Sequence, residues 1–186
     1  MATSIGLVNA QKGYISFQYA PSFSTSNLNE YISEPSIRGF QFEYKKAINE
    51  NIFIGVDAGW NYFNERKDHD VYTFDNVAIS GVQYRKSISV PVLFAIDYRF
   101  KLESKFSPYV NFGLGTMYTT RTTDMGILRA NIDVWQFVIK PEVGFMYELF
   151  PKGALKFSAK YYNGFEADNI KGQTYFSLGF GYVILL

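Results

Sequence analysis

The chain has 186 residues, with 18 Lys and Arg against 17 Asp and Glu, and it contains no cysteine. The length suits one domain, the near-neutral charge gives no electrostatic case for binding nucleic acid, and the lack of cysteine excludes disulfides and thiol chemistry. Eighteen Phe, fifteen Tyr and fifteen Gly are typical of a protein built from many strands rather than of a helical bundle.

The first ten residues, MATSIGLVNA, resemble the end of a secretory signal peptide. A short apolar piece is followed by Val8-Asn9-Ala10, which has the small-x-small form of a cleavage site. No basic segment precedes the apolar piece, so a frayed N-terminus is the alternative. We assign residues 1–10 to a residual signal-peptide tail and residues 11–186 to one folded domain.

The rest of the chain contains eight segments in which apolar and polar residues alternate with the two-residue period of a β-strand. They cover residues 14–23, 37–46, 52–63, 87–100, 106–118, 134–149, 155–162 and 176–184. Four connections between them are long and polar, namely Ser24–Pro35, Asn64–Ser80, Arg121–Asp133 and Asn163–Gly172. The other three, near Asn49, Glu103 and Lys152, are short. A strict alternation of long and short connections is typical of an outer-membrane barrel with both chain termini in the periplasm.

The clearest pair of strands lies between Ser87 and Tyr118. Its first strand places seven apolar residues on one face: Ile88, Val90, Val92, Phe94, Ile96, Tyr98 and Phe100. Such a face spans roughly 40 Å at ~3.3 Å per residue, which is enough to cross a bilayer along a tilted path. We therefore predict an all-β fold, an eight-stranded antiparallel up-and-down transmembrane β-barrel.

The opposite faces of the strands carry acids and bases in equal number. These residues are Glu43, Lys45, Asp57, Asp97, Arg99, Lys140, Glu142, Lys156 and Lys160, with Glu148 in addition. An eight-stranded barrel is only wide enough inside for its own side chains. The charges must therefore pair across the lumen or bind trapped water. The pattern predicts a lumen ion-pair network that fills the barrel, and not a pore.

Three stretches carry a resemblance to a known family. They are SISVPVLFAIDYRF (87–100), FSPYVNFGLGTMY (106–118) and GFQFEYKKAINENIFIGVDAGWNY (39–62). Together they resemble hairpins of the small gram-negative outer-membrane β-barrel family often labelled porin-family or PorT-like. The resemblance implies an OmpA/OmpX-like eight-stranded fold in the bacterial outer membrane, without shared catalytic residues. Barrels of this kind often end on an aromatic residue, whereas this chain ends Ile184-Leu185-Leu186.

The longest connection, Asn64–Ser80, combines charges with aromatic residues, which is the composition expected of a contact surface. We take as a candidate partner-binding loop Arg66, Asp68, His69, Tyr72 and Phe74. Besides outer-membrane lipid, the expected partner is another envelope protein, a surface polysaccharide or a host molecule, and not nucleic acid. The only histidine lies between two acids in one short run, which does not make a metal or hydrolase site. We predict no catalytic, metal or cofactor-binding residues.

The leading interpretation is a non-enzymatic outer-membrane barrel that displays its outer loops for binding. One alternative is an outer-membrane enzyme that modifies lipid, which would need a nucleophile, a base and an acid close together. Another is a soluble lipocalin-like carrier, in which the apolar faces would point inward around a ligand.

Overall fold

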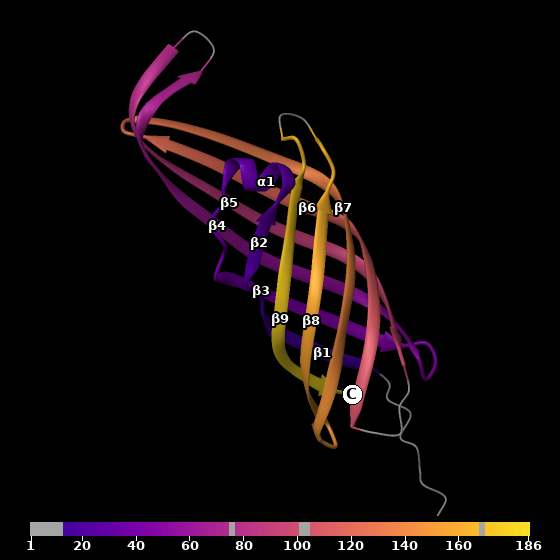
Figure 1. Cartoon of the computed structure of the whole chain (residues 1–186). Helices are drawn as coiled ribbons and strands as arrows, with labels where there is room; N and C mark the ends of the chain where they lie inside the picture. The colour runs from indigo at the N-terminus through magenta and orange to yellow at the C-terminus, as the bar shows by residue number, and fades with distance from the viewer. Residues whose placement is uncertain (1–12, 75–76, 101–104, 168–169) are drawn as a thin grey trace, which may run out of the picture.

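The computed structural model describes residues 13–74, 77–100, 105–167 and 170–186, whose strands wind into one antiparallel barrel (Figure 1). In chain order the elements are β1 (Gly13–Tyr19), β2 (Ser22–Thr25), α1 (Ser26–Tyr31), β3 (Arg38–Ala47), β4 (Ile52–Phe74), β5 (Val77–Arg99), β6 (Phe106–Met125), β7 (Leu128–Phe150), β8 (Gly153–Gly164) and β9 (Gln173–Leu185). Each strand from β3 to β9 pairs with the next in the chain. This is the predicted up-and-down order.

The first strand closes the barrel. In β1, Tyr14 lies opposite Lys45 of β3 on one side and opposite Leu185 of β9 on the other. After an interruption at Ala20-Pro21, β2 continues the pairing with β9, so β1 and β2 together make one wall strand. Counted this way, the described chain has eight barrel strands, which confirms the predicted fold. Closure gives the backbone N–H and C=O groups of β1 and β9 partners, as a bilayer core requires.

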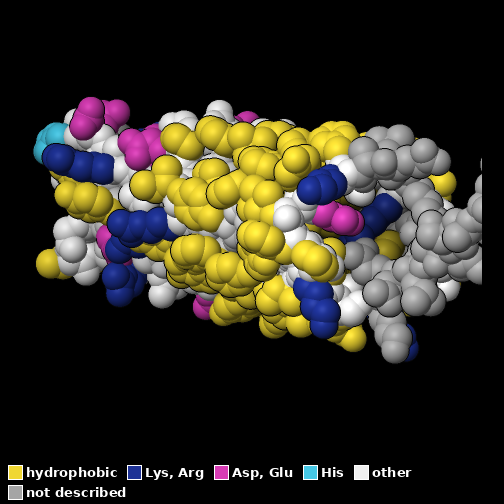
Figure 2. All heavy atoms as spheres, turned by 90° about the horizontal axis from the view of Figure 1, so that it is seen from below, with side chains coloured by type: hydrophobic (Ala, Val, Ile, Leu, Met, Phe, Trp, Pro, Cys, Tyr) yellow, Lys and Arg dark blue, Asp and Glu magenta, His cyan; other side chains and the backbone are white. Residues whose placement is uncertain are grey.

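The outer surface is an apolar belt. Phe94 and Ile96 are 56% and 46% exposed, whereas their neighbours Leu93 and Ala95 are buried. Figure 2 shows hydrophobic side chains over the middle of the wall and charged ones toward both ends. Phenylalanine rings from four successive strands form a row on this surface, with centroids 5.0, 4.9 and 4.8 Å apart: Phe106, Phe145, Phe157 and Phe180. The belt contradicts the lipocalin-like alternative, because a soluble carrier turns such faces inward.

Four strands are much longer than the membrane requires. β4, β5 and β7 have 23 residues each and β6 has 20, whereas a bilayer is crossed by about 9–11. The prediction that Asn64–Ser80 and Arg121–Asp133 are loops was therefore wrong for most of their length. A two-stranded ribbon in water needs no apolar face, so its sequence lacks the alternation from which the other strands were predicted.

Both projecting ladders stay paired to the ends of their strands, and the β6–β7 hairpin closes in a tight turn. The β4–β5 ladder continues to the pair Phe74 and Val77, and the β6–β7 ladder continues to Met125 and Leu128. The β6–β7 turn contains Gly126 with φ at +58°, a conformation that glycine adopts without steric cost. The β4–β5 hairpin reaches furthest from the barrel in Figure 1.

The first predicted loop, Ser24–Pro35, contains the short helix α1 at the barrel mouth (Figure 1). Leu28 and Ile32 are fully buried and pack in one cluster with residues of the barrel interior, including Phe63 and Tyr175. The helix therefore closes the end from which the long hairpins project. In the last predicted loop, residues 163–172, β8 extends to Gly164 and a single bridge joins Ala167 to Ile170.

The opposite end carries the short turns and both ends of the described chain. The Leu186 N–H donates to the Gly13 carbonyl at 3.0 Å. The predicted signal-peptide tail and the turn at residues 101–104 lie outside the described residues. In the described part of the chain, no helix is long and apolar enough to cross a membrane.

The belt can be tested by placing a charge on it. We expect Phe94→Arg or Leu114→Arg to destabilise the barrel by about 2–4 kcal/mol, because each residue faces lipid near the middle of the wall. Urea unfolding in phosphatidylcholine vesicles measures this cost. Ile127→Arg, at a fully exposed turn, is the control and should have little effect. Equal effects at both places would mean that the belt does not contact lipid.

Candidate functional site

The interior of the barrel is filled in layers. An apolar cluster at the short-turn end includes Tyr14, Phe53, Tyr109 and Met146. A second apolar cluster lies beneath α1 at the opposite end. Between them lies a layer of charged side chains, which contains eight of the nine residues predicted for the lumen: Glu43, Lys45, Asp57, Asp97, Lys140, Glu142, Lys156 and Lys160. None of these eight is more than 4% exposed.

One half of this network joins β5 to β7. Lys45 lies 3.3 Å from Asp97 and 2.7 Å from Asp57. Asp57 also contacts Lys140 at 2.5 Å, and Lys140 contacts Glu142 at 2.7 Å. Each ammonium group therefore bridges two carboxylates, and the chain of contacts crosses the lumen without a break.

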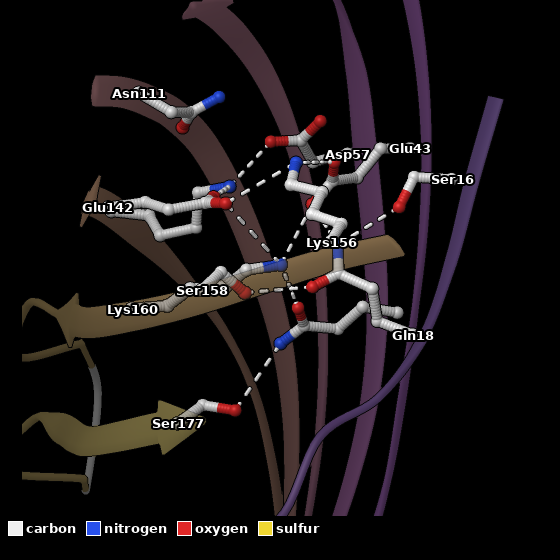
Figure 3. Close-up of polar contacts among 12 residues, drawn as sticks. Ser16, Gln18, Glu43, Asp57, Asn111, Glu142, Lys156, Ser158, Lys160 and Ser177 are labelled. Atoms are coloured by element: carbon white, nitrogen blue, oxygen red, sulfur yellow. Dashed lines mark hydrogen bonds and ion pairs between the residues drawn. The ribbon is translucent and has the colours of Figure 1, made fainter. Parts of the chain in front are cut away.

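The other half returns through β8 to β3. Glu142 lies 3.5 Å from Lys156 and 3.8 Å from Lys160. Both lysines also contact Glu43, Lys160 at 2.8 Å, and Gln18 donates to the same carboxylate at 2.8 Å (Figure 3). The network thus contains four carboxylates and four ammonium groups. Its charges cancel, which is the condition under which buried ions are tolerated.

Two predicted lumen charges are placed differently. The Arg99 guanidinium lies over the rings of Tyr14 and Phe53, with centroid distances of 4.5 and 4.1 Å. It borders the network from the short-turn end. Glu148 lies opposite the buried Ala154 in the β7–β8 register and so keeps the inward parity, but its side chain is exposed at the short-turn end. The register of β7 and β8 shifts only beyond this residue, between Glu148 and Phe150.

The network has the spacing of a metal site but not its chemistry. Carboxylate oxygens of Glu43, Asp57 and Glu142 lie within 4.8 Å of one another. However, Lys140 contacts two of these carboxylates and Lys156 contacts the third. The ammonium groups supply the positive charge that a cation would bring, and we interpret the cluster as structural.

An apolar groove of about 610 Å³ lies on the barrel wall across β7, β8 and β9. Its lining contains two hydroxyl groups, those of Tyr19 and Ser158. The Tyr19 hydroxyl donates to the Ile37 carbonyl at 2.6 Å, and the Ser158 hydroxyl donates to Gln18 at 2.8 Å. Neither His nor an acid is among the described residues that line the groove. The groove therefore lacks the set of groups that a hydrolase would need.

The predicted contact residues lie on the projecting part of β4. Arg66, Asp68 and His69 are exposed, and the β4–β5 register shifts just beyond Lys67. The side chains of Tyr72 and Phe74 lie outside the described residues. The structure thus places Arg66 on the paired ribbon and Asp68 and His69 at its register shift, and not on a loop.

The polar side chains that hold α1 in the mouth were not predicted from the sequence. Glu65 accepts hydrogen bonds from the Ser33 N–H and hydroxyl at 2.9 and 2.7 Å and contacts Lys67 at 2.7 Å. Although burial raises the pKa of Glu65, hydrogen bonds from Lys67 and Ser33 bring it below its ordinary value. The Tyr31 hydroxyl contacts Thr123 at 2.8 Å. These contacts fasten the helix to two long strands.

The outward-facing side of the long strands β5, β6 and β7 carries a separate group of ion pairs. Asp124 lies 2.6 Å from Arg129 and 3.0 Å from Lys86. Hydrogen bonds from Arg129 and Lys86 lower the pKa of Asp124 to about 2. The carboxylate therefore stays charged at any physiological pH, and both cations remain paired.

A closed barrel with an apolar belt and a charged interior defines an integral membrane β-barrel protein. The family model described as outer membrane protein beta-barrel domain matches residues 7–183. The chain belongs to this family, which places it in the outer membrane.

Solved structures with the same fold differ in what they do. Neisserial surface protein A (NspA) has a TM-score of 0.63 and 14% identity, covering 94% of this chain and 97% of that one. The Yersinia pestis protein Ail, in complex with the heparin analogue sucrose octasulfate, has a TM-score of 0.54 and 16% identity, covering 93% and 99%. The Escherichia coli outer membrane protease OmpT has a TM-score of 0.54 and 13% identity, covering 80% and 63%. No curated protein matches the sequence.

The network can be tested by removing one cation. We expect Lys140→Met to destabilise the barrel by about 3–5 kcal/mol, because it leaves Asp57 and Glu142 short of a buried partner. Lys86→Met is the matched control, since it breaks an ion pair with Asp124 that water screens. Urea unfolding of both variants in vesicles makes the comparison. Equal small losses would show that the buried pairs do not hold the barrel together.

Proposed function

We propose that this protein is a non-enzymatic outer-membrane barrel whose projecting hairpins bind an anionic surface polysaccharide. The observation that carries the proposal is the length of β4 to β7, which is roughly twice what a membrane crossing takes. The additional residues build a paired surface outside the bilayer, with Arg66, Asp68 and His69 exposed on it. Such a surface serves binding, because it adds nothing to the membrane-spanning wall.

We propose that the long hairpins face the cell exterior and that both chain termini lie in the periplasm. In outer-membrane barrels the periplasmic turns are short and the outer connections are long. The short turns, Gly13 and Leu186 all lie at the end opposite the hairpins. A secretory signal on residues 1–10 would fit this location, since the chain would be exported to the periplasm before it inserts into the outer membrane.

The chemical class of the partner is supported by one structural neighbour and by the charges of the mouth. The Ail structure contains a sulfated sugar. In this chain, Arg85 and Arg121 lie at the mouth, and among the described residues their hydrogen bonds go to neutral groups. The planar guanidinium group can donate two parallel hydrogen bonds to a sulfate or phosphate group. A neutral sugar has no oxyanion that matches this geometry.

The lipid-modifying alternative finds no support in the described residues. The same fold is found in a protease, OmpT, so the fold alone does not decide between binding and catalysis. The choice between binding and catalysis therefore rests on the side chains in the lumen and in the outer groove. The charged groups of the lumen are buried and paired, and the outer groove contains only Tyr19 and Ser158 as polar side chains.

Removing one hairpin tests the proposed function. We expect replacement of residues 64–86 by Asn-Gly to abolish retention of the purified barrel on immobilised heparin. Phe63 and Ser87, which are partners in the ladder, would then be joined by a two-residue turn. The truncated barrel should still migrate differently in heated and unheated gel samples, because its membrane wall is intact.

Two controls complete this experiment. Immobilised dextran, which has no charge, should retain neither protein. If the truncated barrel is folded and binds heparin as the full chain does, the hairpin is not the binding surface. If the full chain does not bind heparin at all, the proposed partner class is wrong.

A further inference from the structure

Two arginines lie side by side at the barrel mouth, on the inner side of the projecting hairpins. In the β5–β6 register Arg121 is opposite Ser87 and Arg85 is opposite Thr123. Residues placed diagonally in this way point to the same face and lie roughly 7–8 Å apart. Both side chains are half-buried. The arginines are therefore close neighbours on one inner surface.

The α1 residue Tyr31 contacts both of these arginines. Its ring centroid is 5.2 Å from the guanidinium carbon of Arg85 and 5.1 Å from that of Arg121. The two guanidinium carbons can be no further apart than the sum of those distances. The Tyr31 hydroxyl is fixed by Thr123 at 2.8 Å and by the Thr122 carbonyl at 3.0 Å. The ring is thus a rigid wall against which both cations rest.

The hydrogen bonds of Arg85 all go to neutral oxygens. Its Nε donates to Gln83 at 2.6 Å, and its Nη1 donates to the carbonyls of Tyr31 at 3.0 Å and Glu30 at 3.4 Å. Glu65 is directly opposite Arg85 in the β4–β5 register, but its carboxylate is engaged by Ser33 and Lys67. The acid best placed to neutralise Arg85 is therefore committed elsewhere.

Arg121 is held in the same way. Its Nη2 donates to Gln173 at 2.7 Å and to the Gly172 carbonyl at 3.0 Å, and its Nε donates to Gln173 at 3.3 Å. Neither arginine has a carboxylate within ion-pair distance in the described part of the chain. No described residue accepts from Nη1 of Arg121 or Nη2 of Arg85.

This arrangement differs from that of the other cations named above. Lys140, Lys156 and Lys160 are buried and contact carboxylates, and the outward-facing Lys86 and Arg129 share Asp124. Arg85 and Arg121 instead place two like charges close together, partly shielded from water, and no carboxylate of the described residues lies within ion-pair distance of either. Such a pair favours an anion between the two groups.

We propose that Arg85 and Arg121 form a binding site for a sulfate or phosphate group on an anionic polysaccharide. This inference rests on the proposed function and names the residues that carry it. Each guanidinium offers an N–H that no described residue uses, and oxyanions accept such donors in bidentate geometry. The site faces the mouth rather than the lipid-facing wall, which favours a ligand from outside the cell over the headgroup of a neighbouring lipid.

The test is a calorimetric titration of the full-length barrel, in uncharged detergent, with sucrose octasulfate. Sucrose and inorganic sulfate are titrated as separate probes. We expect Arg85→Gln and Arg121→Gln each to weaken binding of sucrose octasulfate at least tenfold. Arg129→Gln is the matched control, because it removes one exposed arginine from the outward-facing side of a projecting hairpin, and it should change affinity less than twofold.

Each outcome decides between defined alternatives. Equal weakening by all three variants would mean that binding is diffuse, which overturns the site and leaves the proposed function standing. No binding of sucrose octasulfate by the unmodified barrel would overturn both. Binding of inorganic sulfate as tight as that of sucrose octasulfate would mean a free-anion site and not a polysaccharide site.

A second variant covers a possible failure to fold. Arg121→Lys keeps the charge and loses the planar fork, so binding should fall between those of the unmodified barrel and Arg121→Gln. Heated and unheated gel samples establish that each variant is folded. Affinity of the folded Arg121→Gln variant equal to that of the unmodified barrel would contradict direct contact with the anion.

Discussion

Four carboxylates and four ammonium groups share a space inside the barrel that is closed to water. Moving each ion out of water costs several kcal/mol, and only complete pairing offsets that cost. Pairing in turn fixes the strand register. A slip of one residue in β3 would move Glu43 and Lys45 from the lumen into lipid and bring Phe42 and Tyr44 inside. The ionic layer therefore specifies the arrangement of the wall around it.

The membrane determines how much of the fold the sequence could predict. Inside the bilayer each strand alternates between lipid and lumen, so the residue period alone assigned Phe94 to the belt and Asp97 to the interior. The same rule brought together Glu43, Asp57 and Glu142 from three strands. It gave Glu148 the same face as the buried Met146 but not its exposure, because Glu148 lies at the end of the barrel. Alternation predicts the face of a side chain, whereas its burial also depends on its position along the barrel axis.

Beyond the bilayer no strand face contacts lipid, so apolar and polar residues need not alternate. The strands were not predicted there for this reason. The projecting ribbons are wet on both sides, so their strands were predicted as loops. Arg85 is two residues from the buried Ser87, and Arg121 is two residues from the buried Thr119. Each arginine therefore lies on the same strand face as a buried neighbour. Continuing each strand outward would have placed both arginines on the inner face. For α1, Leu28 and Ile32 have helical spacing, but six residues are too few for a periodic signal.

The most direct measurement of the ionic layer is the conductance of the purified barrel in a planar bilayer. A lumen whose charges are paired with one another, and closed above and below by apolar clusters, leaves no path for hydrated ions. Our account predicts a baseline without stable single-channel steps under an applied voltage. Reproducible, ion-selective steps from the folded protein would contradict it, because they would require an open aqueous path through the network.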